Sequence, residues 1–491
     1  MESTTRLDRL RVKLRPVTLV IYTFSLVLDV LNSTGVTFAI DSISREYHIS
    51  ENESSWALSA YALTFGAFLL ISGRLGDVVG HKNIFVLGLL FSALFSALIA
   101  GIANDISLFV LRAFQGISAA MTVPTAYALV SVSYSGRARE LALSVLGMGI
   151  ASGSALGMIV GGAVTKSPLG YRALFWISFA LSMTFCILSI FLVPPSKANL
   201  PLARNLDYIG AVLVTAAMLL IVLGFTEAPG HWSAGKTLGP LISGIGLMGC
   251  FALWDEYLLP RMAPDKEPLI PRRLWSFRNS AAILPITAFS YGTVYLILLT
   301  GSQFLVQIQG KSALIASVEY LPFAIVPLIV MPVFGVLHSK VDPKWVITAG
   351  EAIVIVGNVL FSRNSFDTTY WRFTFPATIL ISVGTAAFFV NNINIAVAGA
   401  PKADQGLVAG VVQSVSQASV AIAFSISGSF LTGKTPTTLL KGYRNAFYCA
   451  CGFSGAALLI TIALLRKRAL AIPDGSSNSS DNQTAAQETK A

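Results

Sequence analysis

Long apolar runs separated by short polar segments make up most of this chain. A window of about 19 residues finds about fourteen runs in which about 18 or more residues are mostly apolar. A helix of that length crosses the hydrocarbon core of a bilayer, whereas strands of a membrane barrel need only about ten residues and alternate polar with apolar positions. The pattern predicts an all-α polytopic membrane protein with about fourteen transmembrane helices. The predicted spans are 17–40, 54–74, 83–103, 107–130, 139–165, 173–193, 207–226, 238–258, 281–306, 313–337, 344–362, 373–398, 405–431 and 444–466.

Composition supports this class of protein. Hydrophobic residues make up 54% of the chain and charged residues 12%, which is about half of the charged fraction of a soluble protein. The net charge of +10 does not indicate nucleic-acid binding, because the basic residues gather at span ends rather than on one face. The basic segment 1–16 is similar to the start of a signal peptide, but the apolar run after it is too long and lacks a small-residue cleavage site. We therefore predict an uncleaved first span.

The basic residues are divided unevenly between the two sides of the predicted membrane. Of the 34 Lys and Arg residues, 23 lie on the side of the two termini, 10 lie on the opposite side, and Arg112 lies inside a span. Because cytoplasmic loops carry the excess of Lys and Arg, both termini are predicted to be cytoplasmic, and we expect the plasma membrane. The sequon Asn52-Glu53-Ser54 then lies outside, which makes Asn52 a candidate glycosylation site.

Metal, cofactor and nucleotide binding are not indicated. The four cysteines lie inside apolar runs and the four histidines lie far apart in the sequence, so neither type forms a ligand cluster. The chain has no Gly-x-x-x-x-Gly-Lys-Ser/Thr segment, which argues against an ATP-driven pump. We expect no metal, no cofactor and no enzymatic activity, and we interpret the cysteines as structural thiols.

A compact charged segment at 73–82 separates the second and third predicted spans. Gly73 and Gly80 allow a tight turn, and Asp77 can cap a helix or pair with a basic residue such as Lys82, which stabilises one conformation. Such a hinge suits helices that must slide past each other, so the segment indicates a transporter. The alternative is an ordinary charged turn.

Glycines recur at intervals of about four residues in the span 139–165. Spacing of this kind leaves one helix face without side chains, so that a neighbouring helix can approach closely. Ordinary helix packing is sufficient to explain the pattern. The more specific hypothesis is that these glycines take part in gating of transport. The residues concerned are Gly153, Gly157, Gly161 and Gly162.

Three segments resemble motifs of one transporter family in the correct order. Residues 73–82 resemble the loop between the second and third helices of the major facilitator superfamily. Residues 111–116, with Arg112, Gln115 and Gly116, resemble its fourth-helix motif, and residues 153–162 resemble its fifth-helix antiporter motif.

Two further segments resemble the fourteen-span branch of that family, closest to the fungal drug:proton antiporters. They are Leu28-Asp29 with Asn32, Thr34 and Ala39, and Asp207-Tyr208-Ile209-Gly210. Two positions differ from the family pattern: His81 replaces an arginine of the loop motif, and Met158 replaces a proline of the antiporter motif.

The resemblance implies two six-helix halves with two inserted helices between them. The halves would open alternately to each side around a site near the bilayer midplane, in a cavity lined by spans 1, 4, 9 and 12. The expected divisions are a cytoplasmic tail at 1–16, the first half at 17–193, the insert with its linker at 194–258, a cytoplasmic connector at 259–280, the second half at 281–466 and a disordered cytoplasmic tail at 467–491.

Asp29 is an acid about halfway along the first span, roughly 18 Å from its start. A carboxyl at that depth is costly unless it is paired, hydrated or protonated. We interpret Asp29 as a site of proton or substrate coupling, and the alternative is a structural hydrogen bond to a neighbouring helix.

Arg112 is a candidate partner for Asp29, because spans 1 and 4 should face the same cavity. A guanidinium inside a span must be paired or hydrated, and Gln115 lies near the same helix face. We interpret Arg112 as an electrostatic element that modulates proton release. The alternative is a residue that snorkels to the nearby span end.

The second half holds further candidates. Glu351, about seven residues into its span, is either a second titrating acid or a water-facing residue. Aromatic rings with neutral amides suit an amphiphilic organic solute, although the asparagines can equally hydrogen-bond helices together. The cavity candidates are Tyr291, Tyr295, Gln303, Phe388, Asn391 and Asn392.

The resemblance implies secondary transport of a small-molecule substrate in exchange for protons. The leading hypothesis is proton-coupled efflux of a drug, toxin or secondary metabolite by a monomer in the lipid bilayer. Alternatives are export of a small inorganic acid such as borate, import of a nutrient, and a non-transporting membrane sensor. A sensor usually needs a sizeable cytoplasmic domain, and the predicted tails cover only 1–16 and 467–491, so transport is favoured.

Overall fold

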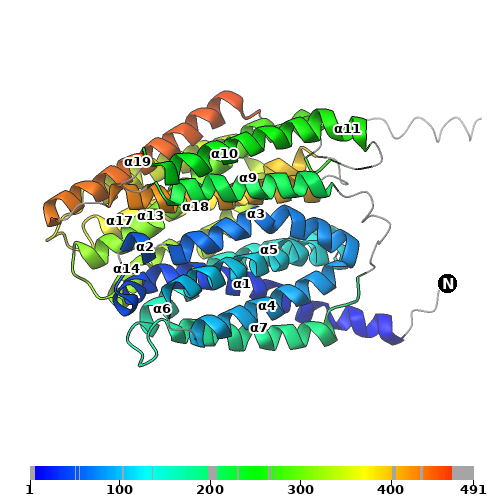
Figure 1. Ribbon diagram of the computed structural model, residues 1–491, viewed down its shortest axis with the longest axis horizontal. Helices are drawn as coiled ribbons and strands as arrows, with labels where there is room; N and C mark the ends of the chain where they lie inside the picture. The colour runs from blue at the N-terminus through cyan, green and yellow to red at the C-terminus, as the bar shows by residue number, and fades with distance from the viewer. Residues whose placement is uncertain are drawn as a thin grey trace, which may run out of the picture.

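The chain forms a bundle of long helices that run roughly side by side (Figure 1). The computed structural model describes residues 6–49, 51–54, 56–101, 104–134, 136–196, 207–228, 232–263, 266, 268–270, 273–400, 405–431 and 435–466. All regular structure in those ranges is helical. The helices are α1 (Arg6–Tyr47), α2 (Glu51–Ser54), α3 (Trp56–Val79), α4 (His81–Gly101), α5 (Asp105–Ser133), α6 (Gly136–Val164), α7 (Arg172–Leu192), α9 (Tyr208–Thr226), α10 (Gly235–Leu253), the π-helix η1 (Trp254–Leu258), α11 (Leu259–Met262), α12 (Arg273–Ser276), α13 (Ser280–Gln307), α14 (Ala313–Tyr320), α15 (Pro322–Lys340), α16 (Pro343–Ser362), α17 (Thr374–Ala398), α18 (Gln405–Phe430) and α19 (Pro436–Leu464).

The number of membrane-length helices matches the prediction. Thirteen helices among the described residues are long and apolar enough to cross a membrane, and α3, bent by 50° between Trp56–Leu69 and Ile71–Val79, brings the number to fourteen. The predicted all-α polytopic architecture is therefore confirmed. The first helix is longer than predicted, because it continues through Asp41 and Arg45, which pair with each other one turn apart at 2.8 Å.

The helices pack as two groups. The first group contains α1, α3, α4, α5, α6 and α7, and the second contains α13 to α19. In Figure 1 the first group, in blue to cyan, fills the lower part of the view, and the paired green helices α9 and α10 lie above it. Two segments beside this pair, 197–206 and 229–231, are outside the described residues.

Helix α9 lies along the seam where α3 of the first group meets α18 of the second. The hydroxyl of Thr215 donates to the backbone oxygen of Ala67 in α3 at 3.3 Å. At the other end of α9, the hydroxyl of Ser425 in α18 donates to the backbone oxygen of Phe225. Helix α9 of the inserted pair, predicted to lie outside the moving halves, therefore contacts both of them.

The two groups also meet along a second seam, where α6 packs against α14 and α15. A Cβ atom at Gly162 would collide with Ser317 of α14, so the backbones approach closely there. Nearby, the ring of Phe38 in α1 lies edge-on to Tyr320, with 6.3 Å between the centroids. These contacts hold the groups together at the end of the bundle where α1 and α13 finish.

The segment predicted as a solvated connector, 259–280, packs partly against the bundle. Leu259, Leu269 and Leu274 are buried, and the backbone nitrogen of Leu269 donates to the carboxyl of Asp255 at 3.0 Å. The tail at 467–491, predicted to be disordered, lies outside the described residues.

Candidate functional site

Asp29 is held in the interior of the first group of helices. It is 8% exposed, and its carboxyl accepts one hydrogen bond, at 3.0 Å, from the hydroxyl of Thr122 in α5. The hydroxyl of Tyr61 in α3 reaches the backbone oxygen of the same residue at 3.4 Å. Among the described residues no Lys, Arg or His forms an ion pair with Asp29. A charged carboxyl that is buried with one neutral partner is costly in a membrane interior.

Arg112 is fully buried, with 0% of its surface exposed. Its Nε donates to the backbone oxygen of Ala57 and its Nη1 to the side-chain oxygen of Gln115, both at 2.7 Å. Gln115 in turn donates to the hydroxyl of Ser96 in α4 at 2.8 Å. The guanidinium also lies over the ring of Tyr61, 4.4 Å from its centroid, an arrangement that is attractive for a cation.

Two sequence-based interpretations of Arg112 are wrong. It does not pair with Asp29, because its hydrogen bonds go to α3 and to its own helix, and Tyr61 lies against it. It does not snorkel to the membrane surface either, because it is fully buried. Gly116, the third motif residue, lets α5 approach α3, since a Cβ atom there would collide with the backbone oxygen of Tyr61.

The segment 73–82 is mostly helical rather than a loop. Helix α3 continues to Val79 and α4 begins at His81, so that Gly80, with a φ of 101°, makes the turn. Gly73 lies within α3, and the prediction that it forms part of the turn is wrong. Lys82 ties the turn to the end of α7, since its backbone nitrogen donates to Ser196 Oγ and its Nζ to the backbone oxygen of Ile190, both at 2.9 Å.

Asp77 faces the residue that departs from the family pattern. The Nε2 atom of His81 lies 3.5 Å from its carboxyl, one turn further along the chain. This pair carries opposite charges only when the histidine is protonated. Gly76 is packed against the same histidine, because a Cβ atom there would lie 2.6 Å from its Nδ1.

The glycine series of α6 serves two different contacts. Gly153, Gly157 and Gly161 face α1, where Cβ atoms would clash with Val27, Thr34 and Gly35. These contacts lie within the first group, as the helix-packing interpretation expects. Gly162 alone in this set faces α14, across the seam between the groups. Helix α6 runs unbroken past Met158, so the position that replaces the family's proline does not interrupt the helix.

The aromatic cavity candidates gather at the junction of α13 and α17. The ring of Tyr291 lies edge-on to Phe389 at 5.0 Å and to Phe388 at 5.8 Å between centroids. Tyr295 contacts Phe424 of α18 at 6.0 Å. Phe388 is buried, whereas Tyr291, Tyr295 and Phe389 are half-buried, so these three rings form the accessible part of the cluster.

The amide candidates do not join that cluster. Asn392 accepts from the hydroxyl of Thr287 in α13 at 2.7 Å, and Asn391 donates to the backbone oxygen of Ala387 in its own helix at 2.8 Å. Asn392 therefore supports the interpretation that asparagines bond helices together, whereas the hydrogen bond of Asn391 to Ala387 lies within α17. Gln303 instead lines a small cleft between α1 and α13, and its buried side-chain oxygen has no hydrogen-bond partner among the described residues.

Glu351 lies in the interior of the second group of helices. It is 2% exposed, and its carboxyl accepts from the hydroxyl of Ser290 in α13 at 2.5 Å. The alternative that it faces water is wrong for this structure. The carboxyl therefore belongs to the contact between α13 and α16 and lies apart from Asp29.

The sequence-based interpretation missed Tyr61 and Thr122. Their signal was present, since both are polar residues inside predicted spans next to the marked helices. Nothing in one sequence, however, shows that Tyr61 of α3 reaches both Asp29 and Arg112. That arrangement depends on how α1, α3 and α5 pack.

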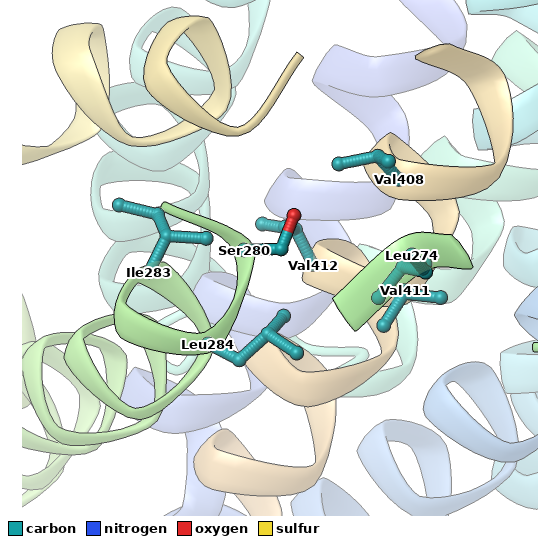
Figure 2. A pocket seen from close by; sticks show the side chains of 7 residues that line it. All are labelled: Leu274, Ser280, Ile283, Leu284, Val408, Val411 and Val412. Carbon is teal, nitrogen blue, oxygen red and sulfur yellow. The ribbon is translucent and has the colours of Figure 1, made fainter. Parts of the chain in front are cut away.

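Two further features lie away from the predicted residues. An apolar cleft between α13 and the first turns of α18 is lined by Ile283, Leu284 and Val412, with Ser280 as a polar member (Figure 2). At the other end of the second group, Gln309 donates to the backbone oxygens of Ser365 and Thr368, at 3.2 and 3.1 Å.

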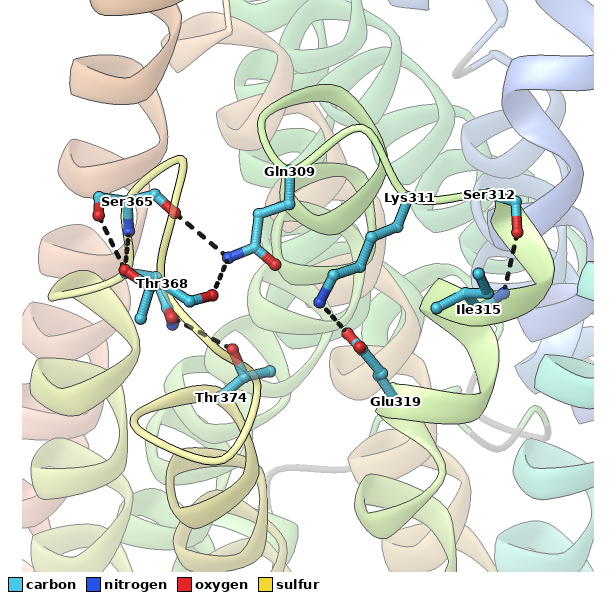
Figure 3. A network of polar contacts seen from close by, with 9 residues as sticks. Gln309, Lys311, Ser312, Ile315, Glu319, Ser365, Thr368 and Thr374 are labelled. Atoms are coloured by element: carbon cyan, nitrogen blue, oxygen red, sulfur yellow. Dashed lines mark hydrogen bonds and ion pairs between the residues drawn. The ribbon is translucent and has the colours of Figure 1, made fainter.

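A short ion pair completes the polar network beside Gln309. Lys311 Nζ lies 2.5 Å from Glu319 Oε2, between the loop after α13 and α14 (Figure 3). Burial and the nearby Glu319 carboxylate raise the pKa of Tyr370, in the adjoining loop, to about 12. The network fastens loops of the second group to one another and does not reach the first group.

Comparisons with known proteins give one consistent result. A family model described as the Major Facilitator Superfamily matches residues 22–318 and 283–487. The low affinity ammonium transporter of Saccharomyces cerevisiae is 30% identical over 426 residues, which cover 83% of this chain and 79% of that protein. The aminotriazole resistance protein of the same yeast is 26% identical over 449 residues, covering 89% and 82%.

A bacterial relative and a solved structure are also similar to this chain over most of its length. The cephamycin export protein CmcT of Amycolatopsis lactamdurans is 28% identical over 452 residues, covering 89% of this chain and 90% of that protein. The crystal structure of a bacterial homolog of the human lysosomal transporter Spinster superposes with a TM-score of 0.63 at 15% identity, covering 93% of this chain and 99% of the other. At that identity the likeness concerns the fold alone.

Proposed function

Because this chain belongs to the major facilitator superfamily, we propose that it is a proton-coupled exporter of a small organic compound, such as a drug, toxin or secondary metabolite. The chain is a multi-pass membrane transporter and not an enzyme, as its family and relatives establish. The proposal adds the coupling ion, the direction of transport and the class of substrate.

One observation carries the proposed coupling. Asp29 is a buried carboxyl inside a membrane span with a single neutral side-chain partner, Thr122. A charged acid in that position is costly, whereas a protonated one is not. Binding a proton from one side of the membrane and releasing it to the other would link the proton gradient to movement of the two helix groups.

The packing of the two groups supports an alternating-access cycle. Phe38 and Tyr320, and Gly162 and Ser317, close one end of the bundle. With cytoplasmic termini this end would face outward, and these contacts support a conformation in which the groups meet on the outer side. The turn at Gly80, with Asp77 and Lys82, would then stabilise this state from the cytoplasmic side.

The half-buried rings of Tyr291, Tyr295 and Phe389 support an amphiphilic organic substrate, because they offer apolar faces beside polar hydroxyls. Relatives named for resistance to aminotriazole and for export of cephamycin support the outward direction. We further propose that the protein acts as a monomer in the plasma membrane with both termini in the cytoplasm.

A second candidate function is movement of ammonium, as nutrient import. It is favoured by the 30% identity to a relative named as a low affinity ammonium transporter. An uptake assay with radiolabelled methylammonium separates the two candidates. Uptake above that of the Asp29→Asn variant favours import, and no uptake favours export.

The coupling is tested with Asp29→Asn, which keeps size and polarity but removes the titratable proton. Purified protein is reconstituted into vesicles, and efflux of compounds found in a toxicity panel is measured at several imposed pH gradients. The variant is expected to lose gradient-driven transport and to keep substrate exchange at equal pH on both sides. Gradient dependence retained by Asp29→Asn would exclude Asp29 as the proton carrier. Independence of the gradient in the unaltered protein would overturn the antiporter proposal.

A further inference from the structure

We propose that Glu351 is the centre of a second binding site for a monovalent coupling cation, separate from Asp29 and located in the second group of helices. The inference rests on the proposed function, because it concerns the ions that drive transport. It adds a second carboxyl and a named set of oxygen donors.

Three helices bring oxygen donors together at this carboxyl. Glu351 of α16 accepts from the Ser290 hydroxyl of α13 at 2.5 Å. The Ser454 hydroxyl of α19 lies beside the same carboxyl and donates its one proton to the hydroxyl of Thr293 at 3.2 Å. One carboxyl and three hydroxyls therefore form a compact cluster of oxygen donors, a set that suits a hard cation.

Among the described residues, no Lys, Arg or His forms an ion pair with this carboxyl. Helices α13 and α17 contain no Asp, Glu, Lys or Arg. In α16, Lys344 donates instead to the backbone oxygen of Ile462 at 2.7 Å. The basic residues of α19, Lys441 and Arg444, precede Ser454 by more than two helical turns. The other titratable residues of these helices are Tyr291, Tyr295, Tyr443, Tyr448, Cys449 and Cys451.

The negative charge of Glu351 must therefore be neutralised by something other than a basic side chain. A carboxylate that is 2% exposed and has only hydroxyl partners is costly in the membrane interior. A bound proton or a bound sodium ion removes that cost, and each supplies a single positive charge. The shared chemistry is a monovalent cation on a carboxyl supported by hydroxyl oxygens.

Asn358 supplies a second, independent observation. Its side chain is fully buried, and neither its amide nitrogen nor its amide oxygen has a hydrogen-bond partner among the described residues. It lies seven residues after Glu351, which places both side chains on one face of α16 about 10.5 Å apart. A buried amide without partners is costly. The same face of α16 therefore carries unmet hydrogen-bonding capacity two helical turns from the acid, in the interior of this group.

The test uses the full chain carrying Asp29→Asn, so that the first acid cannot contribute. Infrared difference spectra of the protein in lipid nanodiscs are recorded as the pH is lowered, and a protonated carboxyl gives a C=O band. The component of the band that belongs to Glu351 is expected to be lost when Glu351→Gln is added and to persist when Asp367→Asn, an exposed loop acid, is added instead, while the other acids of the chain supply the rest of the band. The same band with and without Glu351→Gln would overturn the proposal.

A second variant keeps the acid and changes its surroundings. Ser290→Ala removes the 2.5 Å hydrogen bond and is expected to raise the frequency of the C=O band, because a carbonyl that accepts no hydrogen bond vibrates faster. An unchanged frequency would contradict the assignment of the band to Glu351.

Sodium distinguishes the two cations. At constant pH and ionic strength, sodium that competes for the site lowers the band intensity, while a proton site shows no response to sodium. Either result supports the cation site and identifies its occupant. Because these spectra are taken without Asp29, they are independent of whether Asp29 carries the transported proton.

Discussion

The guanidinium carbon of Arg112 lies 4.4 Å from the ring centroid of Tyr61, and this contact occupies the place where sequence reasoning expected a carboxylate. The same tyrosine reaches the backbone oxygen of Asp29 with its hydroxyl. Tyr61 thus links Asp29 and Arg112, two buried ionisable residues of the first group. One nitrogen of the guanidinium, Nη2, has no hydrogen-bond partner among the described residues. The contact with the Tyr61 ring therefore supplies part of the stabilisation that a hydrogen bond to Nη2 would give.

A replacement of Tyr61 that removes the aromatic ring is expected to destabilise the protein more than one that keeps it. Tyr61→Leu removes the face on which the buried cation rests, and a desolvated contact of this kind is worth about 2 kcal/mol. Tyr61→Phe keeps the face and loses only the long hydroxyl contact. The measurement is the thermal midpoint of the purified protein in detergent, which is expected to fall clearly for the leucine variant and little for the phenylalanine variant. Equal midpoints for the two variants would show that the ring does not support Arg112.

Gly162→Ala is expected to loosen the closed end of the bundle. The added Cβ atom would collide with Ser317 of α14, so the two helix groups must separate to relieve it. Labelling of a cysteine at position 303, in the cleft between α1 and α13, by a membrane-impermeant maleimide reports this opening. We expect a several-fold faster reaction than in the parent carrying Gln303→Cys alone.

The control for this experiment is on the same helix. A Cβ atom at Gly147 would meet nothing within 4 Å, so Gly147→Ala should leave the labelling rate unchanged. If both alanine variants accelerate labelling equally, the effect belongs to α6 as a whole and not to the seam.

Gly80→Ala is expected to destabilise the turn between α3 and α4. Gly80 has a φ of 101°, a conformation that costs an alanine about 1–2 kcal/mol, and its added Cβ atom would lie 2.9 Å from Ser196 Oγ. Gly73→Ala, inside the helix with Pro124 Cβ 4.0 Å from the added atom, should be neutral or slightly stabilising. Thermal midpoints of the two variants compare them directly, and a larger loss for Gly73→Ala would contradict the assignment of the turn to Gly80.

The orientation predicted from basic residues is tested with epitope tags. Tags at both termini should be detected only after cells are permeabilised, because the side with 23 Lys and Arg residues faces the cytoplasm. Asn52→Gln should increase electrophoretic mobility if a glycan is attached outside. Detection of either tag in intact cells would reverse the orientation.

The fold could be predicted from hydropathy because a bilayer imposes one length and one polarity on every span. The exceptions follow local rules. Asp41 and Arg45 ended the apolar run, yet their pairing within the helix lets α1 continue. Gly73 indicated part of a turn, yet glycine within a helix costs only about 1 kcal/mol relative to alanine, which the packing of α3 can offset.

The site was harder to predict, because the partners of a buried charge depend on helix rotation. The sequence marked Asp29, Arg112 and Glu351 as unusual, and all three are buried. It did not indicate that Arg112 would bond to the backbone of Ala57, since every residue offers such an oxygen. Nor did it distinguish asparagines that bond helices together, such as Asn392, from side chains that line a cavity.

Helix α9 covers one of the two seams between the helix groups and leaves the other without a covering helix among the described residues. The seam between α3 and α18 is covered by α9, with α10 packed behind it. On the other side, α6 meets α14 and α15, and the described helices include no outer helix that contacts both partners there. Among the described helices, the contact between the two groups on this flank is therefore made mainly by α6, α14 and α15, so a change in their packing meets no additional outer helix that could oppose it.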